Sequence, residues 1–130
     1  AVIPAFIDRA INGENLSIYG DGNQTRDFVH VIDVVKSILG ALENEIGKNT
    51  VLNIGTGRGT SVIDLAKTIL EVVENNGLSK PGIEFLPARD GDLDHSIADT
   101  QGLSQILNTE EMIFLTDGIN DLVGHKISSI

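Results

Sequence analysis

The chain has 130 residues, no cysteine, and 19 acidic against 9 basic side chains, so its formal net charge is −10. This composition excludes a disulfide scaffold and a zinc–thiolate site, and it disfavours binding to nucleic acid or to an anionic membrane surface. Hydrophobic residues make up 41% and charged residues 22%, the mixture of an ordinary globular domain. Because we find neither a membrane-spanning apolar run nor an export signal, we expect a cytoplasmic protein.

The first half of the chain alternates helix and strand patterns. Apolar spacing predicts a helix over residues 3–12, followed by a short strand at Leu16–Tyr19. A turn rich in glycine and aspartate then leads into a second strand at 28–31. Asp33 is expected to cap a helix that reaches Gly47. The apolar stripe expected to bury this helix consists of Val34, Val35, Ile38, Leu39, Ala41 and Leu42.

A buried strand is predicted at Val51–Ile54, because these residues are too apolar for an open edge. The glycine-rich segment 55–60 should be a loop that opens a helix at Ser61. Ser61 and Asp64 have the spacing of a capping box, and the helix should end near Asn76-Gly77.

The rest of the chain contains weaker patterns. We expect a strand at Ile83–Leu86, a short helix over residues 99–107, and a last helix capped by Thr116. Strands and helices are interleaved, which favours an α/β or α+β layer arrangement.

The glycine loop could bind phosphate, since glycine residues before a helix let an anion approach backbone amides. Its spacing is G-x-G-x-G, with Thr60 where a dinucleotide fingerprint has its third glycine. We therefore interpret Gly55, Gly57 and Gly59 as packing glycines.

An acidic turn alternates Asp90, Asp92 and Asp94 like the start of a calcium loop. The glycine and closing glutamate positions of such a loop hold His95 and Gln101, so a solvated turn is expected and no metal site. His30 is interpreted as a hydrogen-bonded, partly buried residue in a strand.

Two arginines sit in turns beside strands, where a rigid scaffold can present their side chains. The planar fork of Arg26 or Arg89 suits phosphate oxygens. Each also has acidic neighbours, Asp27 beside Arg26 and Asp90 after Arg89, so weak surface ion pairs are the alternative.

Four segments in order resemble NAD-dependent sugar-nucleotide epimerases and dehydratases, the extended short-chain dehydrogenase/reductase group that includes UDP-glucose 4-epimerase. Residues 16–35 read LSIYGDGNQTRDFVHVIDVV and resemble that family's LxIYGDGxQxRDFVHVxDVV motif. The other matching segments are VIPAFI at 2–7, NIGTG at 53–57 with the helix that follows, and PARDGD at 87–92 with Ser96 and Asp99.

The resemblance implies a fold and a site. The fold would be an α/β (α+β) fragment, the carboxy-terminal substrate-binding portion of the family, lacking most of the Rossmann domain. Residues 1–107 would hold the nucleotide end of a nucleoside-diphosphate sugar, and residues 108–130 would form a divergent carboxy-terminal helix or tail. The implied binding residues are Arg26 and Arg89 at the diphosphate, Tyr19 beside the base, the backbone of Leu16, Ser17 and Ile18 at the base edge, and Asp92 near the ribose.

The catalytic and cofactor motifs of the family lie outside the matched segments. NAD would be the cofactor of the parent protein, yet this chain has Asn23 where a lysine should follow Tyr19 in a Y-x-x-x-K pair. We therefore expect no catalysis and no cofactor binding by this chain alone. An interaction module that docks a separate cofactor-domain chain, or an unstable remnant, stays open. Self-association through an exposed Val51–Ile54 edge is a further expectation.

Overall fold

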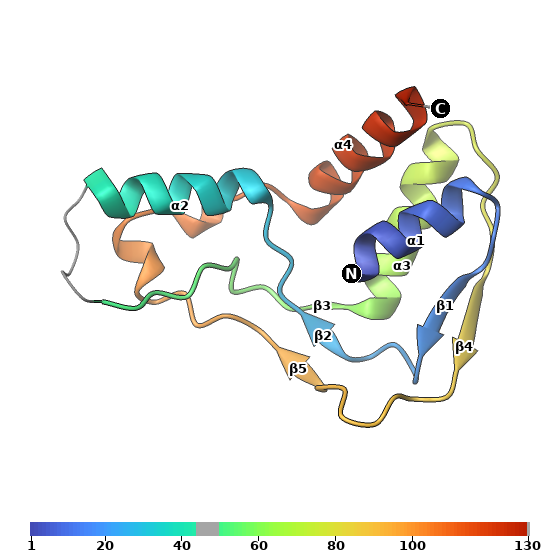
Figure 1. The fold of residues 1–130 in the computed structure, drawn as a ribbon, viewed down its shortest axis with the longest axis horizontal. Coiled ribbons are helices and arrows are strands. Elements are labelled where there is room, and N and C mark those ends of the chain that lie inside the picture. The colour runs from blue at the N-terminus through green and yellow to red at the C-terminus, as the bar shows by residue number, and fades with distance from the viewer. Residues whose placement is uncertain (44–49, 130) are drawn as a thin grey trace.

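The computed structural model describes residues 1–43 and 50–129, and its main body is built around a small parallel sheet (Figure 1). Strand β1 (Leu16–Tyr19) pairs with β4 (Ile83–Leu86), with Leu16 opposite Ile83. Helices α1 (Val2–Ile11), α3 (Val62–Asn75) and α4 (Leu115–Ser128) pack with these strands. The predictions for these two strands and for the first and third helices are confirmed within one or two residues.

Local sequence signals fix the ends of α3. The hydroxyl of Ser61 accepts the amide of Asp64 at 3.1 Å, so the expected cap is present. The same hydroxyl donates to the Asp64 carboxylate at 2.6 Å, whereas in a full capping box that carboxylate would accept the Ser61 amide. At the other end, Gly77 has a φ of 80°, a left-handed conformation that glycine adopts without strain.

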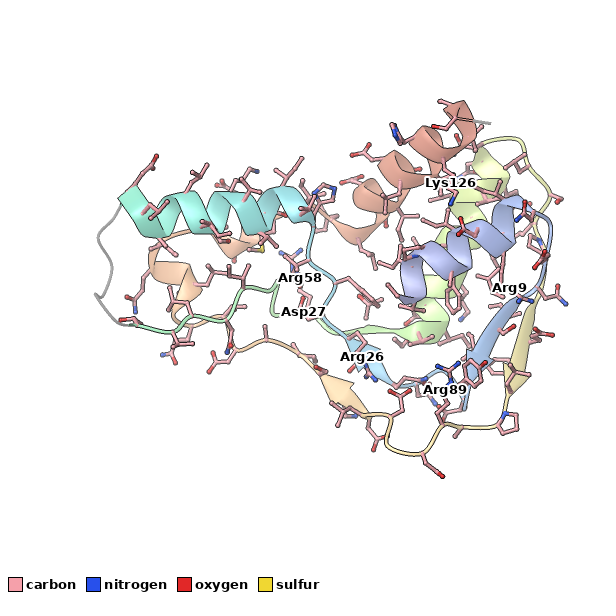
Figure 2. The ribbon with its side chains drawn as sticks, viewed as in Figure 1. Arg9, Arg26, Asp27, Arg58, Arg89 and Lys126 are labelled. Atoms are coloured by element: carbon pink, nitrogen blue, oxygen red, sulfur yellow. The ribbon has the colours of Figure 1, made fainter. Side chains whose placement is uncertain are left out.

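Charged side chains join α1 to its neighbours. Lys126 of α4 forms an ion pair with Asp8 of α1 (Figure 2). Arg9 donates to the carbonyl of Asn15 at 2.6 Å and pairs with Glu84 of β4 at 3.4 Å. These contacts are largely exposed, so they orient the elements more than they stabilise the fold.

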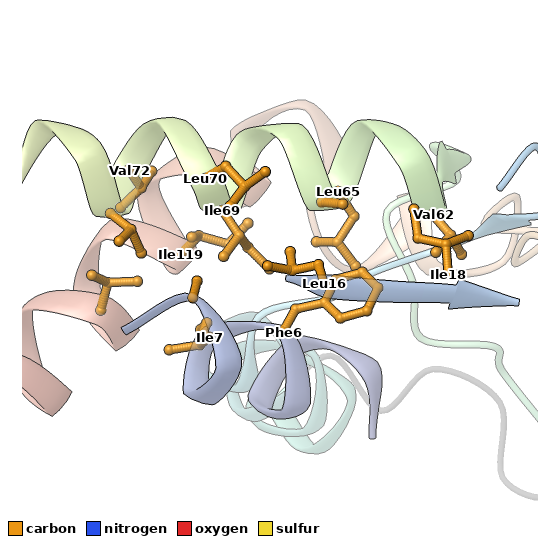
Figure 3. Packing of buried hydrophobic residues seen from close by; sticks show 14 residues of the cluster. Phe6, Ile7, Leu16, Ile18, Val62, Leu65, Ile69, Leu70, Val72 and Ile119 are labelled. Carbon is orange, nitrogen blue, oxygen red and sulfur yellow. The ribbon is translucent and has the colours of Figure 1, made fainter. Parts of the chain in front are cut away.

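The hydrophobic core lies between α3, β1 and α1 (Figure 3). Leu16 and Ile18 of β1 meet Leu65 and Ile69 of α3, and all four side chains are almost fully buried. Helix α4, which lies in the predicted divergent carboxy-terminal helix or tail at 108–130, belongs to the same core. The other buried members include Phe6, Ile7, Ala10, Val62, Ala66, Leu70, Val72, Val73, Ile119 and Val123.

A second sheet of very short strands joins the body to the rest of the chain. Strand β2 (Thr25–Arg26) is central, antiparallel to β3 (Thr60–Ser61) and parallel to β5 (His95–Ser96). The predicted strand at 28–31 is wrong. Strand pairing ends after the amide of Asp27 donates to Ser96, and residues 28–30 run extended without a strand partner among the described residues.

Helix α2 (Val31–Glu43) begins earlier than expected and is not capped by Asp33. His30 serves at this end instead: its Nδ1 accepts the amide of Ile32 at 3.2 Å, and its carbonyl accepts that of Asp33 at 3.0 Å. The prediction of a hydrogen-bonded, partly buried His30 is confirmed, but in a helix cap. Asp33 is buried in the first turn, where it accepts the amide of Ile113 at 2.8 Å. The expected extension to Gly47 lies outside the described residues.

The predicted burial of the α2 stripe is wrong for most of its members. Val35, Ile38, Leu39 and Leu42 are about half exposed or more, and the buried residues of α2 are polar. In Figure 1 the helix extends away from the body, so little of the chain covers its outer side.

The predicted strand at Val51–Ile54 is also wrong. These residues are extended but pair with no strand in the described chain, and Val51 is 93% exposed. A strand needs a neighbouring strand to satisfy its backbone groups, and sequence apolarity cannot supply one.

The segment that precedes α4 contains less helix than the sequence predicted. Within 99–107 the structure has a single 3₁₀ turn, η1 (Leu103–Gln105), and a second one, η2 (Thr109–Glu111), follows. Thr116 lies inside the first turn of α4, whose cap is Phe114, so the expected cap is wrong.

The α/β class is confirmed. Among the described residues, no helix combines the length and apolarity needed to cross a membrane.

Candidate functional site

A groove beside β1 brings together most of the predicted binding residues. The groove has a volume of about 470 Å³ and lies between β1, the start of α1 and the loop after β4. Six of the seven predicted residues line it: Ser17, Ile18, Tyr19, Arg26, Arg89 and Asp92. The seventh, Leu16, has a fully buried side chain and belongs to the core.

The backbone of β1 has one free edge. The amides of Leu16 and Gly20 donate to Gly82 and Leu86 of the β4 segment, each at 2.9 Å. Since a strand in a parallel pair bonds its neighbour with alternate residues, Ser17 and Tyr19 direct their amides and carbonyls away from β4. Gln24 occupies the Tyr19 carbonyl at 2.9 Å. The Ser17 backbone has no strand partner on that side within the described residues.

Arg89 stacks on the ring of Tyr19. The guanidinium carbon lies 3.6 Å from the ring centroid, the geometry of a close cation–π contact. This contact holds Arg89 over the groove, and it also occupies one face of the ring. A flat ligand can therefore stack only on the other face.

Arg26 is held by two acceptors. Its Nη1 donates to the carbonyl of Thr25 at 2.8 Å, and its Nη2 lies 2.5 Å from Oδ1 of Asp92. Arg26 therefore forms a surface ion pair, as the alternative interpretation expected, but its partner is Asp92 and not the neighbouring Asp27. The two side chains remain 26% and 42% exposed, so the pair is open to solvent.

Both arginines face the same groove, as the labelled side chains in Figure 2 allow the reader to follow. Arg26 and Arg89 place two positive charges against the single negative charge of Asp92. The groove is thus locally cationic on a chain of net charge −10. Fixed guanidinium groups of this kind are suited to bidentate contacts with phosphate oxygens.

An adjoining pocket of about 530 Å³ is more acidic. It shares Tyr19, Arg89 and Asp92 with the groove and adds Asp21 and Asp94. In the acidic turn, Asp92 is bound to Arg26, and no group of three potential metal ligands gathers in the part of the chain that the structure describes.

Asp27 is a structural residue that the sequence interpretation missed. Its Oδ1 accepts the amide and hydroxyl of Thr56 at 3.0 and 2.5 Å, and its Oδ2 accepts the amides of Gly57 at 2.9 Å and Ala98 at 3.3 Å. One carboxylate thus joins the glycine loop to the segment after β5. The only sequence signal was its place beside Arg26, which suggested an ion pair.

The packing interpretation of the glycine loop is confirmed. A Cβ on Gly55 would lie 2.5 Å from the Cβ of Ala98, and one on Gly59 would lie 2.5 Å from Ile97. Gly55 therefore has no room for a side chain, and a side chain at Gly59 would have to displace the end of Ile97.

The same loop is a poor cradle for NAD, because its anion-binding amides are already used. Asp27 takes the amides of Thr56 and Gly57, and in the first turn of α3 the amides of Val62 and Ile63 donate to the Gly20–Gln24 turn. A pyrophosphate at this helix start would find no free donor among those groups.

Comparisons with known proteins show which family the fold of this chain resembles. The model of the NAD dependent epimerase/dehydratase family matches residues 1–55. The dTDP-4-dehydro-6-deoxy-D-allose reductase of Streptomyces bikiniensis is 33% identical over 110 residues, which is 84% of this chain and 32% of the reductase.

Solved structures show the same fold over nearly the whole chain. UDP-glucose 4-epimerase from Thermotoga maritima, solved with UDP-glucose, is 35% identical with a TM-score of 0.82 over 99% of this chain. UDP-glucuronic acid 4-epimerase from Bacillus cereus, solved with UDP-glucuronic acid and NAD, is 28% identical with a TM-score of 0.74 over 97%. This chain spans 40% of each of those two proteins. Residues 1–55 thus match the NAD dependent epimerase/dehydratase family, and the chain folds like part of the extended short-chain dehydrogenase/reductase epimerases.

Proposed function

We propose that the groove beside β1 binds the nucleotide end of a nucleoside-diphosphate sugar. The observation that carries this proposal is the groove that Arg26 of β2 shares with Arg89 of the loop after β4. Each guanidinium would bind oxygens of the diphosphate through charge-assisted hydrogen bonds. Desolvating a diphosphate is costly, and two preplaced cations offset that cost.

The base would lie along the free edge of β1. The Ser17 amide and carbonyl can bond to a base edge, and the buried side chains of Leu16 and Ile18 would anchor this strand to the core. Tyr19 would stack on the base with the ring face that Arg89 leaves open. Asp92, next to Arg26, would lie near the ribose hydroxyls.

The reaction of the parent protein is a further part of the proposal. We propose that it is an NAD-dependent nucleotide-sugar epimerase or dehydratase in the cytoplasm. Residues 1–107 would supply the substrate end, and residues 108–130 the closing helix. The glycine loop of this chain does not fit NAD, so hydride transfer is assigned to no residue here.

Calorimetric titration with UDP-glucose and dTDP-glucose tests the binding role. We expect Arg26→Ala and Arg89→Ala each to weaken binding about tenfold or more, since hydrogen bonds to charged groups contribute about 1.5–3 kcal/mol. Arg58→Ala is the matched control, because it removes the same charge at a site where Arg58 lies over Phe114. Equal affinity of the unaltered chain and the Arg26→Ala, Arg89→Ala double variant would contradict the proposed binding of the diphosphate by these two arginines.

Asp92→Asn separates two roles of the Asp92 carboxylate. If it competes with phosphate for Arg26, the variant should bind inorganic pyrophosphate more tightly. If the carboxylate also bonds to the ribose, the increase in affinity of Asp92→Asn should be smaller for UDP-glucose than for pyrophosphate. No change with either ligand would remove Asp92 from the site.

A second candidate function is a non-catalytic interaction module that docks a cofactor-domain chain. The observation that favours it is the exposed apolar side of α2. Adding NAD and a separately expressed cofactor domain of a relative distinguishes the two: recovered turnover supports the substrate-binding role, and tight docking without turnover supports the module.

A further inference from the structure

Tyr19 and Arg89 meet because of the register of the parallel sheet. Tyr19 ends β1 opposite Leu86, the last residue of β4, and the amide of Gly20 donates to the Leu86 carbonyl at 2.9 Å. The chain then turns, and Arg89 lies over the Tyr19 ring. Tyr19 is half-buried, whereas Arg89 is exposed. A strand of the main body thus presents the ring, and an exposed arginine stacks on it.

The two arginines of the groove are held in different ways. The Arg26 guanidinium donates to the Thr25 carbonyl and to the Asp92 carboxylate. Among the residues that the structure describes, the Arg89 guanidinium forms no hydrogen bond and no ion pair, and its contact is with the Tyr19 ring. The orientation of Arg89 therefore depends on that ring.

The stack leaves the hydrogen-bond donors of Arg89 unused. The guanidinium carbon lies 3.6 Å from the ring centroid, which is the van der Waals separation of two flat groups that meet face to face. The five N–H donors of a guanidinium point outward in its plane, so a ring against its face occupies none of them. An ion pair like that of Arg26 instead orients a guanidinium by using donors that a ligand would need.

We propose that Tyr19 is a positioning residue for the diphosphate, acting through Arg89 and independently of any stacking on the base. This inference rests on the proposed function of the groove. A long arginine side chain loses rotamer freedom when it binds a ligand, and the stack removes part of that freedom before the ligand arrives. A ligand with phosphates and no base should therefore still require the ring.

Inorganic pyrophosphate tests the proposal by calorimetric titration, because it offers phosphate oxygens and no base. We expect Tyr19→Leu to weaken its binding about threefold to tenfold. Tyr19→Phe keeps the ring and should bind like the unaltered chain. When Arg89→Ala is already present, Tyr19→Leu should have no further effect, since the two residues act as one unit.

Phe114→Leu is the matched control. It removes a ring whose centroid lies 5.1 Å from the guanidinium carbon of Arg58, and neither residue lines the groove. This variant should bind pyrophosphate like the unaltered chain.

The tyrosine signal gives a second readout, which needs no ligand. Tyr19 is the sole tyrosine and the chain has no tryptophan, so the tyrosine band in near-ultraviolet circular dichroism reports on this ring alone. We expect Arg89→Ala to change that band and Arg58→Ala to leave it unaltered, while the helical far-ultraviolet signal persists in both variants.

Three results would overturn the proposal and leave the proposed function standing. The first is a loss of pyrophosphate binding in Arg89→Ala with none in Tyr19→Leu. The second is an additive loss in the variant that carries both changes, and the third is a tyrosine band that Arg89→Ala does not alter. Absence of any pyrophosphate or UDP-glucose binding by the unaltered chain would overturn the proposed function, and this inference with it.

Discussion

Helices α3 and α2 are nearly equal in length and both carry an apolar stripe, yet they use it in opposite ways. α3 buries its stripe between β1, α1 and α4, with Leu65 and Ile69 fully enclosed. α2 buries Asp33 and Ser37 and leaves Leu39 half exposed. The comparison teaches that helical periodicity identifies an amphipathic helix, while the surrounding chain decides which side is covered.

The largest expected effect tests this contrast with matched leucines. Leu65→Ala should destabilise the chain by about 3 kcal/mol, because it removes buried methyl groups and leaves a cavity. Leu39 is 52% exposed, so Leu39→Ala should change the free energy of unfolding by about 0.5 kcal/mol or less. Urea unfolding followed by circular dichroism measures both, at a concentration where the chain is monomeric. Similar losses would mean that α2 is covered within the monomer.

The next effect concerns Asp27, which lies at the joint between the two regions. Asp27→Ala leaves the amides of Thr56, Gly57 and Ala98 without their acceptor and should cost about 2 kcal/mol. Asp121→Ala, an exposed aspartate of α4, is the control and should stay within about 0.5 kcal/mol.

Exchange of the Thr56 and Gly57 amides, followed by NMR, sharpens the Asp27 prediction. Protection of both amides should fall in Asp27→Ala and persist in the Asp121→Ala control. Unaltered protection would show that another acceptor holds the glycine loop.

The smallest expected effect is a change in acidity at the turn beside the groove. The backbone and side-chain amides of Asn23 bond to the Asp21 carboxylate at 2.9 and 2.8 Å and hold its pKa below the ordinary 3.8. Since the folded pKa is lowered, any stabilisation is present above that ordinary value and is lost as the pH falls through the folded pKa. Asn23→Ala should raise the pKa of Asp21, as followed by NMR titration. The backbone amide of residue 23 remains in that variant, so an unchanged pKa would show that the Asn23 side chain contributes nothing and that the backbone hydrogen bond accounts for the lowering.

Much of the fold was predictable because it depends on local signals. The period of the apolar residues located α1 and α3, and Ser61 with Asp64 marked the start of α3. The residues of β1 and β4 alternate as strands do, so their bounds followed from the sequence. Dense glycine in 55–59 indicated close backbone packing, and Gly55 meets Ala98 as that density suggested.

The candidate site was predictable only as a set of residue types. The motif containing Tyr19 and Arg26, and the later one containing Arg89, suggested phosphate recognition. That Arg89 stacks on Tyr19 and Arg26 pairs with Asp92 depends on how β2 and the loop after β4 meet. The role of Asp27 was equally invisible, since its donors lie far along the chain.

The sequence by itself determined which segments become helices of the body and which residues can bind a phosphate, because helix period, caps and side-chain chemistry are local properties. Only the tertiary structure decided that Val51–Ile54 pairs with no strand among the residues that the structure describes, that α2 turns its apolar side outward, and that Arg26 and Arg89 share one groove. Burial and pairing depend on what lies across from a residue in space, and a linear pattern does not contain that neighbour.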